Sequence, residues 1–298
     1  MAVTLMRHEY EARSLDVFTR DEPCNIVELN QSDESEVVEF LAARPIHTVF
    51  MASLIRDNGL LSPHNRGSFY ACRDRYGLLE GVALIGHATV IEARTENSLA
   101  SFARLARNCL NASLIRGEQE TINNFWKYYA SSGLEPRLIC REMLFQQIEP
   151  LTTPERLDDL RPATLGDLEK VMAVNSAMAF EEGGINPMQK DPGGFRNRTA
   201  RRIEQGRVWV WIQDNRLIFK ADVVSETPEV TYLEGVHVHA EERRQGYGRR
   251  CLTALSSMLL QRSRSVCLTI NERNKAALKF YEKAGYQFHS DYETIYLR

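Results

Sequence analysis

The segment 232–252 places glycines and arginines where a strand should pass into a helix. Its turn, Arg243–Gly248, has glycines at 246 and 248, and two further arginines follow. Leu252, Leu255 and Leu259 form an apolar stripe that predicts a helix. Glycines in a first helical turn let the backbone approach a ligand and leave amide N–H groups facing outward. Together with the positive end of the helix dipole, they predict a phosphate or pyrophosphate site.

Other interpretations of this turn compete with an anion site. The Gly246-x-Gly248 pair is also compatible with a plain tight turn, and the arginines with a solvated helix face. A dinucleotide-binding fingerprint needs a third glycine where Cys251 stands and an acidic residue about twenty positions further on, so we exclude it. The choice between a turn and an anion site depends on the rest of the chain.

A second motif follows the first, and the two together resemble a known family. Asn274, Ala277, Tyr281, Lys283 and Gly285 have the spacing Asn-x-x-Ala-x-x-x-Tyr-x-Lys-x-Gly. With the preceding Arg-x-x-Gly-x-Gly turn, this motif resembles the signatures of the GNAT (N-acetyltransferase) superfamily. The resemblance covers residues 157–298. It implies acetyl-CoA as the co-substrate, and we expect no metal.

The resemblance assigns a set of residues to the acyl-CoA. In the superfamily, two parallel strands splay apart to admit the pantetheine arm, and the turn before the next helix holds the pyrophosphate. The positions that match are Val236, His237, Val238, Arg243, Arg244, Gln245, Gly246, Tyr247, Gly248, Arg249 and Asn274. For Asn274, a plain helix N-cap is an equally good and compatible interpretation.

Tyr281 matches the general acid of the superfamily. Attack of an amine on a thioester gives a tetrahedral intermediate that expels a thiolate, and a phenol can protonate or stabilise that thiolate. The alternative is a core aromatic residue packed with Leu278 and Ala284. Within this motif the acid is the favoured interpretation.

Glu234 is the predicted general base. Alternation along the strand puts Tyr232, Glu234, Val236 and Val238 on one face, toward the thioester. Glu234 would accept the proton of the attacking amine directly or through a water, and an ordinary half-exposed carboxylate is the alternative. His237, on the opposite face with His239, receives no catalytic role.

The acceptor pocket is predicted to include two loop acids. Glu181 and Glu182 fall in the loop between the first two helices of the second half, a region that lines the acceptor pocket in the superfamily. They would supply a base or bind a cationic acceptor, unless they only face water. Tyr232 completes the predicted acceptor contacts.

The order of elements in the second half indicates an α/β protein in the broad sense. Its sheet is expected to be mixed, as in α+β folds, and not doubly wound. Three consecutive strands with short links predict antiparallel pairing, and the later strand–helix–strand unit predicts a parallel pair. The expected elements are a strand at 157–161, helices at 165–179 and 194–205, strands at 207–213, 217–225 and 230–239, a helix at 246–262, a strand at 265–270, a helix at 274–284 and a closing hairpin at 286–298.

Length and repeats predict two domains, 1–150 and 151–298, as tandem GNAT-like folds. At roughly 150 residues per domain, 298 residues suggest two, and two prolines mark a linker at 147–155. The helix–Gly–strand unit at 126–134 echoes the one at 278–286. The first half lacks the CoA turn, and its helix starts at Glu96, an acid that repels phosphate. We expect this half to build part of the acceptor site or an oligomer contact.

Composition excludes several classes. With 43% hydrophobic and 26% charged residues the chain is globular, and its net charge of −3 gives no reason to expect nucleic-acid or membrane binding. No apolar run is long enough for a signal peptide or a membrane span, so we expect a cytoplasmic protein. The six scattered cysteines predict reduced thiols rather than disulfides or a metal site.

The predicted activity is direct transfer of an acetyl group from acetyl-CoA to a primary amine of a small molecule, peptide or protein. A homodimer is one arrangement compatible with this prediction. No cysteine except Cys251 falls in the motifs, so a covalent acyl-enzyme lacks a nucleophile. A non-catalytic CoA-binding scaffold and a transferase for longer acyl-CoA are the alternatives.

Overall fold

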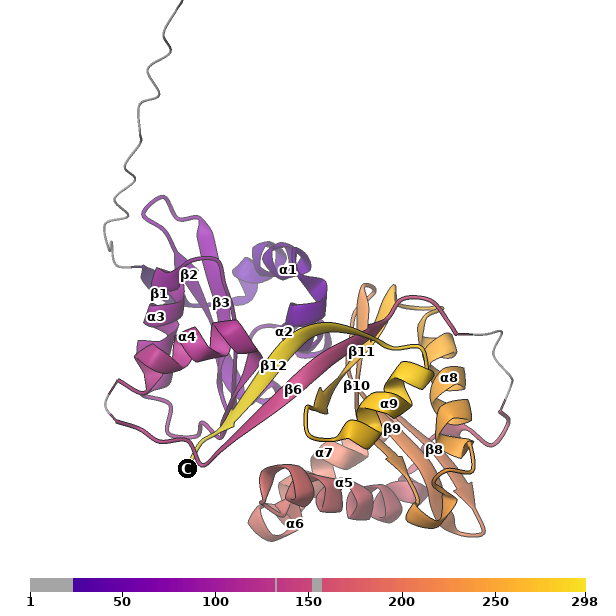
Figure 1. The fold of residues 1–298 in the computed structure, drawn as a ribbon. Coiled ribbons are helices and arrows are strands. Elements are labelled where there is room, and N and C mark those ends of the chain that lie inside the picture. The colour runs from indigo at the N-terminus through magenta and orange to yellow at the C-terminus, as the bar shows by residue number, and fades with distance from the viewer. Residues whose placement is uncertain (1–23, 132, 152–156) are drawn as a thin grey trace, which may run out of the picture.

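A computed structural model describes residues 24–131, 133–151 and 157–298. Within them it forms one mixed sheet with helices on both faces (Figure 1). In the first half the elements are β1 (Asn25–Glu28), α1 (Glu34–Ala42), α2 (Pro45–Asn58), β2 (Gly67–Arg73), β3 (Leu79–Gly86), β4 (Ala88–Ala93), α3 (Glu96–Ala106), β5 (Leu114–Glu118), α4 (Gln119–Tyr129) and β6 (Leu138–Gln147).

The second half repeats this order of elements. They are β7 (Arg161–Pro162), α5 (Leu168–Gly183), α6 (Pro187–Lys190), α7 (Pro192–Glu204), β8 (Val208–Gln213), β9 (Arg216–Glu226), β10 (Val230–Val238), α8 (Tyr247–Leu259), β11 (Ser265–Asn271), α9 (Lys275–Lys283) and β12 (Gln287–Tyr296). Strand β9 pairs antiparallel with β8 and β10, and β10 pairs in parallel with β11. The predicted mixed sheet is therefore confirmed.

The two halves exchange their last strands. Strand order in the described residues is β1-β2-β3-β4-β5-β12-β6-β11-β10-β9-β8-β7, so β12 of the second half pairs with β5 of the first, and β6 pairs with β11. The register sets Ile295 opposite Ile115 and Leu268 opposite Phe145. In Figure 1, β6 and β12 run side by side between the two groups of helices. The two halves thus share the centre of one continuous sheet.

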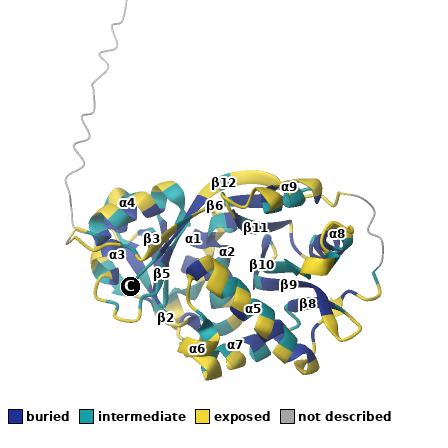
Figure 2. Cartoon of the chain, turned by 60° about the horizontal axis from the view of Figure 1, so that its bottom comes forward, coloured by how far each residue is buried: buried dark blue, intermediate teal, exposed yellow. Residues whose placement is uncertain are grey.

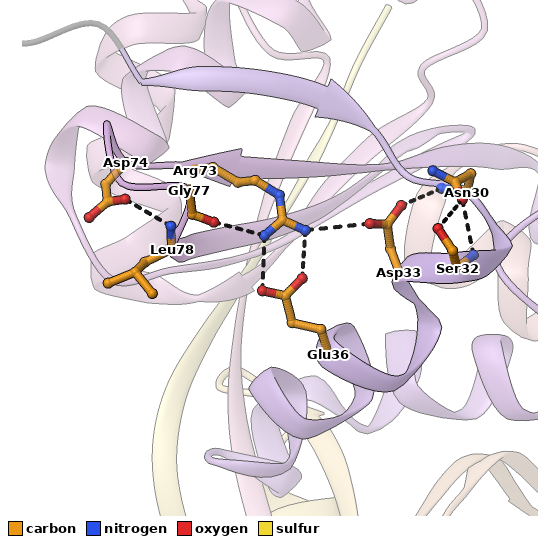
Figure 3. Close-up of polar contacts among 8 residues, drawn as sticks. All are labelled: Asn30, Ser32, Asp33, Glu36, Arg73, Asp74, Gly77 and Leu78. Atoms are coloured by element: carbon orange, nitrogen blue, oxygen red, sulfur yellow. Dashed lines mark hydrogen bonds and ion pairs between the residues drawn. The ribbon is translucent and has the colours of Figure 1, made fainter.

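A capping box opens the helical part of the first half. The Asn30 side chain accepts a hydrogen bond from Ser32 N, and Asp33 accepts one from Asn30 N at 2.9 Å (Figure 3). Arg73 of β2 binds both Asp33 and Glu36, which ties this cap to the strand that follows α2. The cap satisfies amide groups that the first turn leaves without helical partners.

The second half begins with the same device. Thr164 N donates to Asp167 Oδ2 at 2.8 Å, and the Thr164 side chain completes the capping box. Arg161 donates to both oxygens of Asp167, at 2.8 and 3.2 Å. Together with the repeated order of strands and helices, this shared cap supports the predicted internal repeat.

Helix α2 packs against both halves. Ile46 and Val49 of α2 share an apolar cluster with Tyr232 of β10 and Cys267 of β11. The Ser53 hydroxyl accepts a hydrogen bond from the backbone N–H of Glu226 at 3.0 Å. Figure 2 shows α2 near the middle of the molecule, between the first-half sheet and β10. This helix therefore lies close to the strand that carries the predicted base.

Three predicted elements need correction. The expected closing hairpin is one strand, β12, with an irregularity between Phe288 and Ser290 but no reversal, because β5 and β6 supply a partner on each side. Glu181 and Glu182 are not in a loop: they lie in the last turn of α5, which continues to its Gly184 C-cap. The strand expected at 157–161 is reduced to β7. Residues 152–155 of the predicted linker lie outside the described residues.

The cysteines differ in part from the expectation. Cys24 and Cys72 form a disulfide, with Cα atoms 5.9 Å apart, because the pairing of β1 with β2 brings together residues that the sequence separates by 48 positions. Of the remaining cysteines in the described residues, Cys109, Cys140, Cys251 and Cys267 are free thiols. No helix in the described residues is long and apolar enough to span a membrane.

Candidate active site

Strands β10 and β11 separate midway along their length. Residues 230–233 of β10 pair in parallel with residues 265–268 of β11, and the pairing ends there, although β10 continues to Val238 and β11 to Asn271. A bulge between Glu234 and His237, with Gly235 at φ +60°, turns β10 away from its neighbour. The pairing of the two strands thus ends at the position where the sequence predicted the pantetheine arm.

The bulge also changes the predicted faces of β10. Tyr232 lies in the apolar cluster beneath α2, whereas Val236 and Val238 pack against the cluster beneath α8 and α9. The expectation that Tyr232, Glu234, Val236 and Val238 share one face is therefore wrong. The extra residue of a bulge shifts the alternation by one position.

The turn before α8 has the backbone of an anion site. Arg244 has φ +65° and Gly246 has φ +91°, and no side chain caps the first turn of α8. Gly246 faces open space, and Gly248 is buried, where a Cβ would lie 2.7 Å from a Val238 methyl group. Glycine at 248 thus brings the helix start close to β10, with its amide groups uncapped.

The arginines and glutamine of this turn are mostly exposed. Arg243 Nε donates to the Val238 carbonyl at 3.1 Å, which fixes the turn to β10. Gln245 Nε2 donates to the Glu241 carbonyl at 2.8 Å. Arg244 and Arg249 are exposed around the helix start. Their charges add to the positive end of the helix, so the turn fits a phosphate-bearing ligand.

The corresponding helix of the first half is closed to such a ligand. Thr95 caps α3, with its hydroxyl accepting from Ser98 N at 3.2 Å, and Glu96 stands in the first turn. An amide that is already bonded and a nearby carboxylate both disfavour an anion. The contrast between α3 and α8 matches the sequence difference between the halves.

Helix α9 carries Tyr281 next to Phe280, which contacts the turn Arg243–Gly248. The Phe280 ring lies close to Gly248, and Tyr281 packs edge-to-face with Phe280 and Tyr286, with ring centroids 5.0 and 5.9 Å away. Burial and the nearby charge of Glu182 raise the pKa of Tyr281 above its usual value, so the phenol stays protonated. Asn274 caps α9, accepting from Ala277 N at 3.0 Å.

Glu234 is bonded to a residue of the first half. Arg116 of β5 donates to Glu234 Oε1 at 2.7 Å, and it also bonds the Tyr232 hydroxyl. Burial alone would raise the pKa of Glu234, but the charge and hydrogen bond of Arg116 hold this pKa below its usual value. Glu234 is therefore a carboxylate of low basicity.

A polar network continues from Arg116 across the shared strands. The Tyr232 hydroxyl lies 2.9 Å from Thr269 Oγ1 of β11, and Thr269 donates to Glu142 of β6 at 3.0 Å. Arg116 also donates to Thr269, at 2.9 Å. The exchanged strands thus hold β10, β11 and the first half in one hydrogen-bonded arrangement.

Glu182 has the opposite electrostatic environment from Glu234. Glu182 and Glu181, on the last turn of α5, are both exposed. Desolvation by the surrounding protein and the negative charges of Glu234 and Glu142 raise the pKa of Glu182 to about 7. A carboxyl group that titrates near neutral pH is suited to general-base catalysis.

The thiols of Cys140 and Cys251 are poor nucleophiles. Burial raises the pKa of Cys251 to about 12, and the pKa of Cys140 is raised by burial and by Glu142 and Glu182. Neither of these two cysteines is a thiolate at neutral pH.

His237 lies near Lys220 and Arg243, and burial with these charges lowers its pKa to about 4, so its ring is neutral.

Several residues of this site escaped the sequence analysis. Arg116 of β5 and Glu142 of β6 come close to β10 and β11 only because the strand exchange joins the two halves in one sheet, whereas Thr269 lies on β11, the parallel neighbour of β10. A charged residue in the short apolar strand Leu114–Glu118 was the available signal for Arg116.

Comparison with known proteins identifies the second half. A sequence profile of the acetyltransferase (GNAT) family matches residues 176–286, which include β10, the CoA turn, α8, β11 and α9. Residues 176–286 form a GNAT-family domain. The family uses acyl-CoA as a co-substrate, so the reaction class of this domain is acyl-CoA-dependent acyl transfer.

Solved structures share the fold across both halves. A Drosophila protein is 12% identical, with a TM-score of 0.67 over 92% of this chain and 98% of its own. A GCN5-related N-acetyltransferase from Sphaerobacter thermophilus is 12% identical, with a TM-score of 0.60 over 92% and 95%. A tandem GNAT protein from the clavulanic acid biosynthesis pathway is 15% identical, with a TM-score of 0.55 over 92% and 98%. At these identities the likeness shows the fold alone, and no curated protein matches the chain in sequence.

Proposed function

We propose that the GNAT domain transfers an acetyl group from acetyl-CoA to a primary amine, directly within a ternary complex. The observation that carries this proposal is the uncapped start of α8 beside the separated strands β10 and β11, with Tyr281 on the adjoining helix. The turn Arg243–Gly248 would hold the pyrophosphate through its amides, and the backbone of Val236–Val238 would bind the pantetheine arm. Glu181 and Asn274 would border the substrates.

The nitrogen of the acceptor attacks the thioester carbonyl carbon and gives a tetrahedral intermediate. When the carbon–sulfur bond breaks, the electron pair leaves with the sulfur, and Tyr281 donates a hydrogen bond or its proton to this thiolate. Its raised pKa keeps the phenol protonated before the transfer. The carbonyl is restored as an amide, and CoA leaves as the thiol.

We assign removal of the amine proton to Glu182 rather than Glu234. The pKa of Glu182, about 7, makes it the stronger base, whereas Arg116 lowers the pKa of Glu234. Glu234 then orients the amine, with Tyr232 beside it. The protonated thiols of Cys140 and Cys251 give no support to an acyl-enzyme intermediate.

Thiol release from acyl-CoA tests this function and its alternatives. The full chain is mixed with acetyl-CoA, butyryl-CoA or octanoyl-CoA and a panel of primary amines. We expect amine-dependent thiol release that is fastest with acetyl-CoA and an N-acetylated product by mass spectrometry. Faster turnover of butyryl-CoA or octanoyl-CoA would show that the donor is a longer acyl-CoA rather than acetyl-CoA. Binding of acetyl-CoA without turnover on any amine would favour a scaffold.

A further inference from the structure

A cavity of about 730 Å³ lies between the two halves of the chain. Helix α2 and strands β3 to β5 line it from the first half, and α7 and β10 line it from the second. Tyr232, Glu234 and Arg116 form part of its wall, so it reaches the residues placed at the acceptor amine. Its volume suits a small organic molecule rather than a protein chain.

The two sides of this cavity differ in character. The first-half side is largely apolar and includes Val49, Leu54, Leu84 and Val90. The opposite side carries a row of arginines from α7 and the loop after it. Besides Arg116, the arginines that line the cavity are Arg66 from the loop before β2, Arg198, Arg201, Arg202 and Arg207.

Three of these arginines are paired with carboxylates. Arg207 donates to both oxygens of Asp57, at 2.5 and 2.9 Å. Arg198 lies 3.0 Å from Asp191, and Arg202 lies 3.4 Å from Asp222. These ion pairs hold the α7 side of the cavity in place. They also neutralise the carboxylates of Asp57, Asp191 and Asp222.

In the part of the chain that the structure describes, Arg66 and Arg201 have no such ion-pair partner, although the charge of Asp191, which pairs with Arg198, also acts on Arg66. Arg201 donates to the side-chain oxygen of Asn58, a neutral group, at 2.8 Å. In residues 24–131, 133–151 and 157–298, no carboxylate forms an ion pair with Arg66 or Arg201. His87, which also lines the cavity, has its pKa lowered to about 4 by burial and by the charges of Arg66, Lys190 and Arg198. This end of the cavity is thus positively charged.

We infer that the acceptor carries an anionic group, a carboxylate or a phosphate, which Arg66 and Arg201 bind while its amine lies toward Glu234. This inference rests on the proposed function, because it concerns the acceptor of that same site. The planar guanidinium group offers two parallel donors that match the oxygens of either anion. An apolar middle segment would contact the α2 side of the cavity.

The charge distribution selects against a purely cationic acceptor. In this cavity Glu234 suits the amine end alone, and a second ammonium group at the other end would meet Arg66 and Arg201. The cationic acceptor expected from Glu181 and Glu182 is therefore replaced by one with charges of opposite sign at its two ends. Selectivity of this kind comes from both attraction and repulsion.

Four amines of one chain length test this inference. The full chain is assayed with saturating acetyl-CoA and aminohexanoate, aminohexyl phosphate, aminohexanol or diaminohexane. We expect kcat/KM for at least one anionic amine to exceed that of aminohexanol by about tenfold or more, with diaminohexane lowest. The better of the two anionic amines identifies carboxylate or phosphate. Equal or better use of the neutral or cationic amine overturns the inference.

Variants connect the preference to the two arginines. Arg201→Gln should remove most of the preference for the anionic amine, and Arg66→Gln serves the same purpose if the first variant does not fold. Arg196→Gln is the matched control, because Arg196 is exposed on the same helix, pairs with Glu169 and does not line the cavity. An anionic preference that survives in folded Arg201→Gln and Arg66→Gln contradicts the inference.

A binding measurement separates this inference from the proposed function. Hexanoate and hexyl phosphate lack an amine, and we expect at least one to bind the wild-type chain by calorimetry and to bind Arg201→Gln about tenfold more weakly. Anion binding without acyl transfer to any amine would contradict the proposed function alone. Acyl transfer without a charge preference would contradict the inference alone, and so would the absence of binding by both anions.

Discussion

Arg116 Nη1 of β5 lies 2.7 Å from Glu234 Oε1 of β10, so a side chain of the first half is bonded to the strand at the centre of the proposed site. This bond depends on β12 and β6, which join β5 to the second half in one sheet. The first half is thus part of the site even though its own helix start is capped.

Replacement of Arg116 should therefore impair catalysis. In Arg116→Met, Glu234 and Tyr232 lose a charged donor, and we expect kcat/KM to fall about tenfold or more. Steady-state kinetics on the amine that the wild type uses best would measure this. Arg104→Met, on the exposed side of α3, is the control and should match the wild type. Full activity of folded Arg116→Met would refute a role for the first half in the site.

The pH dependence should report Glu182. Because a base must be deprotonated to accept a proton, kcat/KM should rise with pH through about 7, where Glu182 titrates. Glu182→Gln should lower the rate and remove this limb, while Glu181→Gln on the same turn should keep it. The measurement is kcat/KM between pH 5 and 9. If kcat/KM of Glu182→Gln still rises with pH through about 7, the general base is Glu234 or a water molecule instead.

The turn before α8 should determine acyl-CoA affinity. In Gly246→Val, a side chain enters open space at φ +91°, which costs roughly 1–2 kcal/mol of strain and obstructs the proposed pyrophosphate site. We expect the Kd for CoA, measured by calorimetry, to rise at least about tenfold. Gly133→Val has a similar φ of +80° and open surroundings, so it is a matched control that should leave Kd unchanged. Equal affinities of the two variants would contradict the assignment.

The cap of the second half should contribute stability that depends on pH. The Arg161 hydrogen bond lowers the pKa of Asp167 to about 2, so its contribution is present above the ordinary pKa of about 4 and is lost as pH falls through about 2. Asp167→Asn should cost about 1–2 kcal/mol at pH 7 and less at pH 2. Urea unfolding at both pH values measures this, with exposed Asp214→Asn as the control. An equal cost at both pH values would show that the ion pair is unimportant.

Local features of this chain could be predicted from sequence. The turn Arg243–Gly248 and α8 follow from glycine placement and leucine spacing, which act over a few residues. The antiparallel strands β8 to β10 follow from short links in the same way. These elements need no information about distant parts of the chain.

The remaining features depend on long-range pairing. A strand pattern does not specify its neighbour, so β12 was expected to fold back on itself rather than lie between β5 and β6. The bulge at Gly235 adds one residue to β10 and reverses the faces of Val236 and Val238, which strict alternation cannot anticipate. Arg116 joins the site only as a consequence of that pairing.

The most direct test of the account compares wild type and Tyr281→Phe in a single turnover with acetyl-CoA and an acceptor amine. Phenylalanine keeps the ring packing with Phe280 and Tyr286 and removes only the proposed acid. We expect N-acetylated product from the wild type and a rate at least about a hundredfold lower in the variant, with acetyl-CoA affinity unchanged. Equal rates of acyl transfer by the two proteins, or no acylated amine from the wild type, would contradict it.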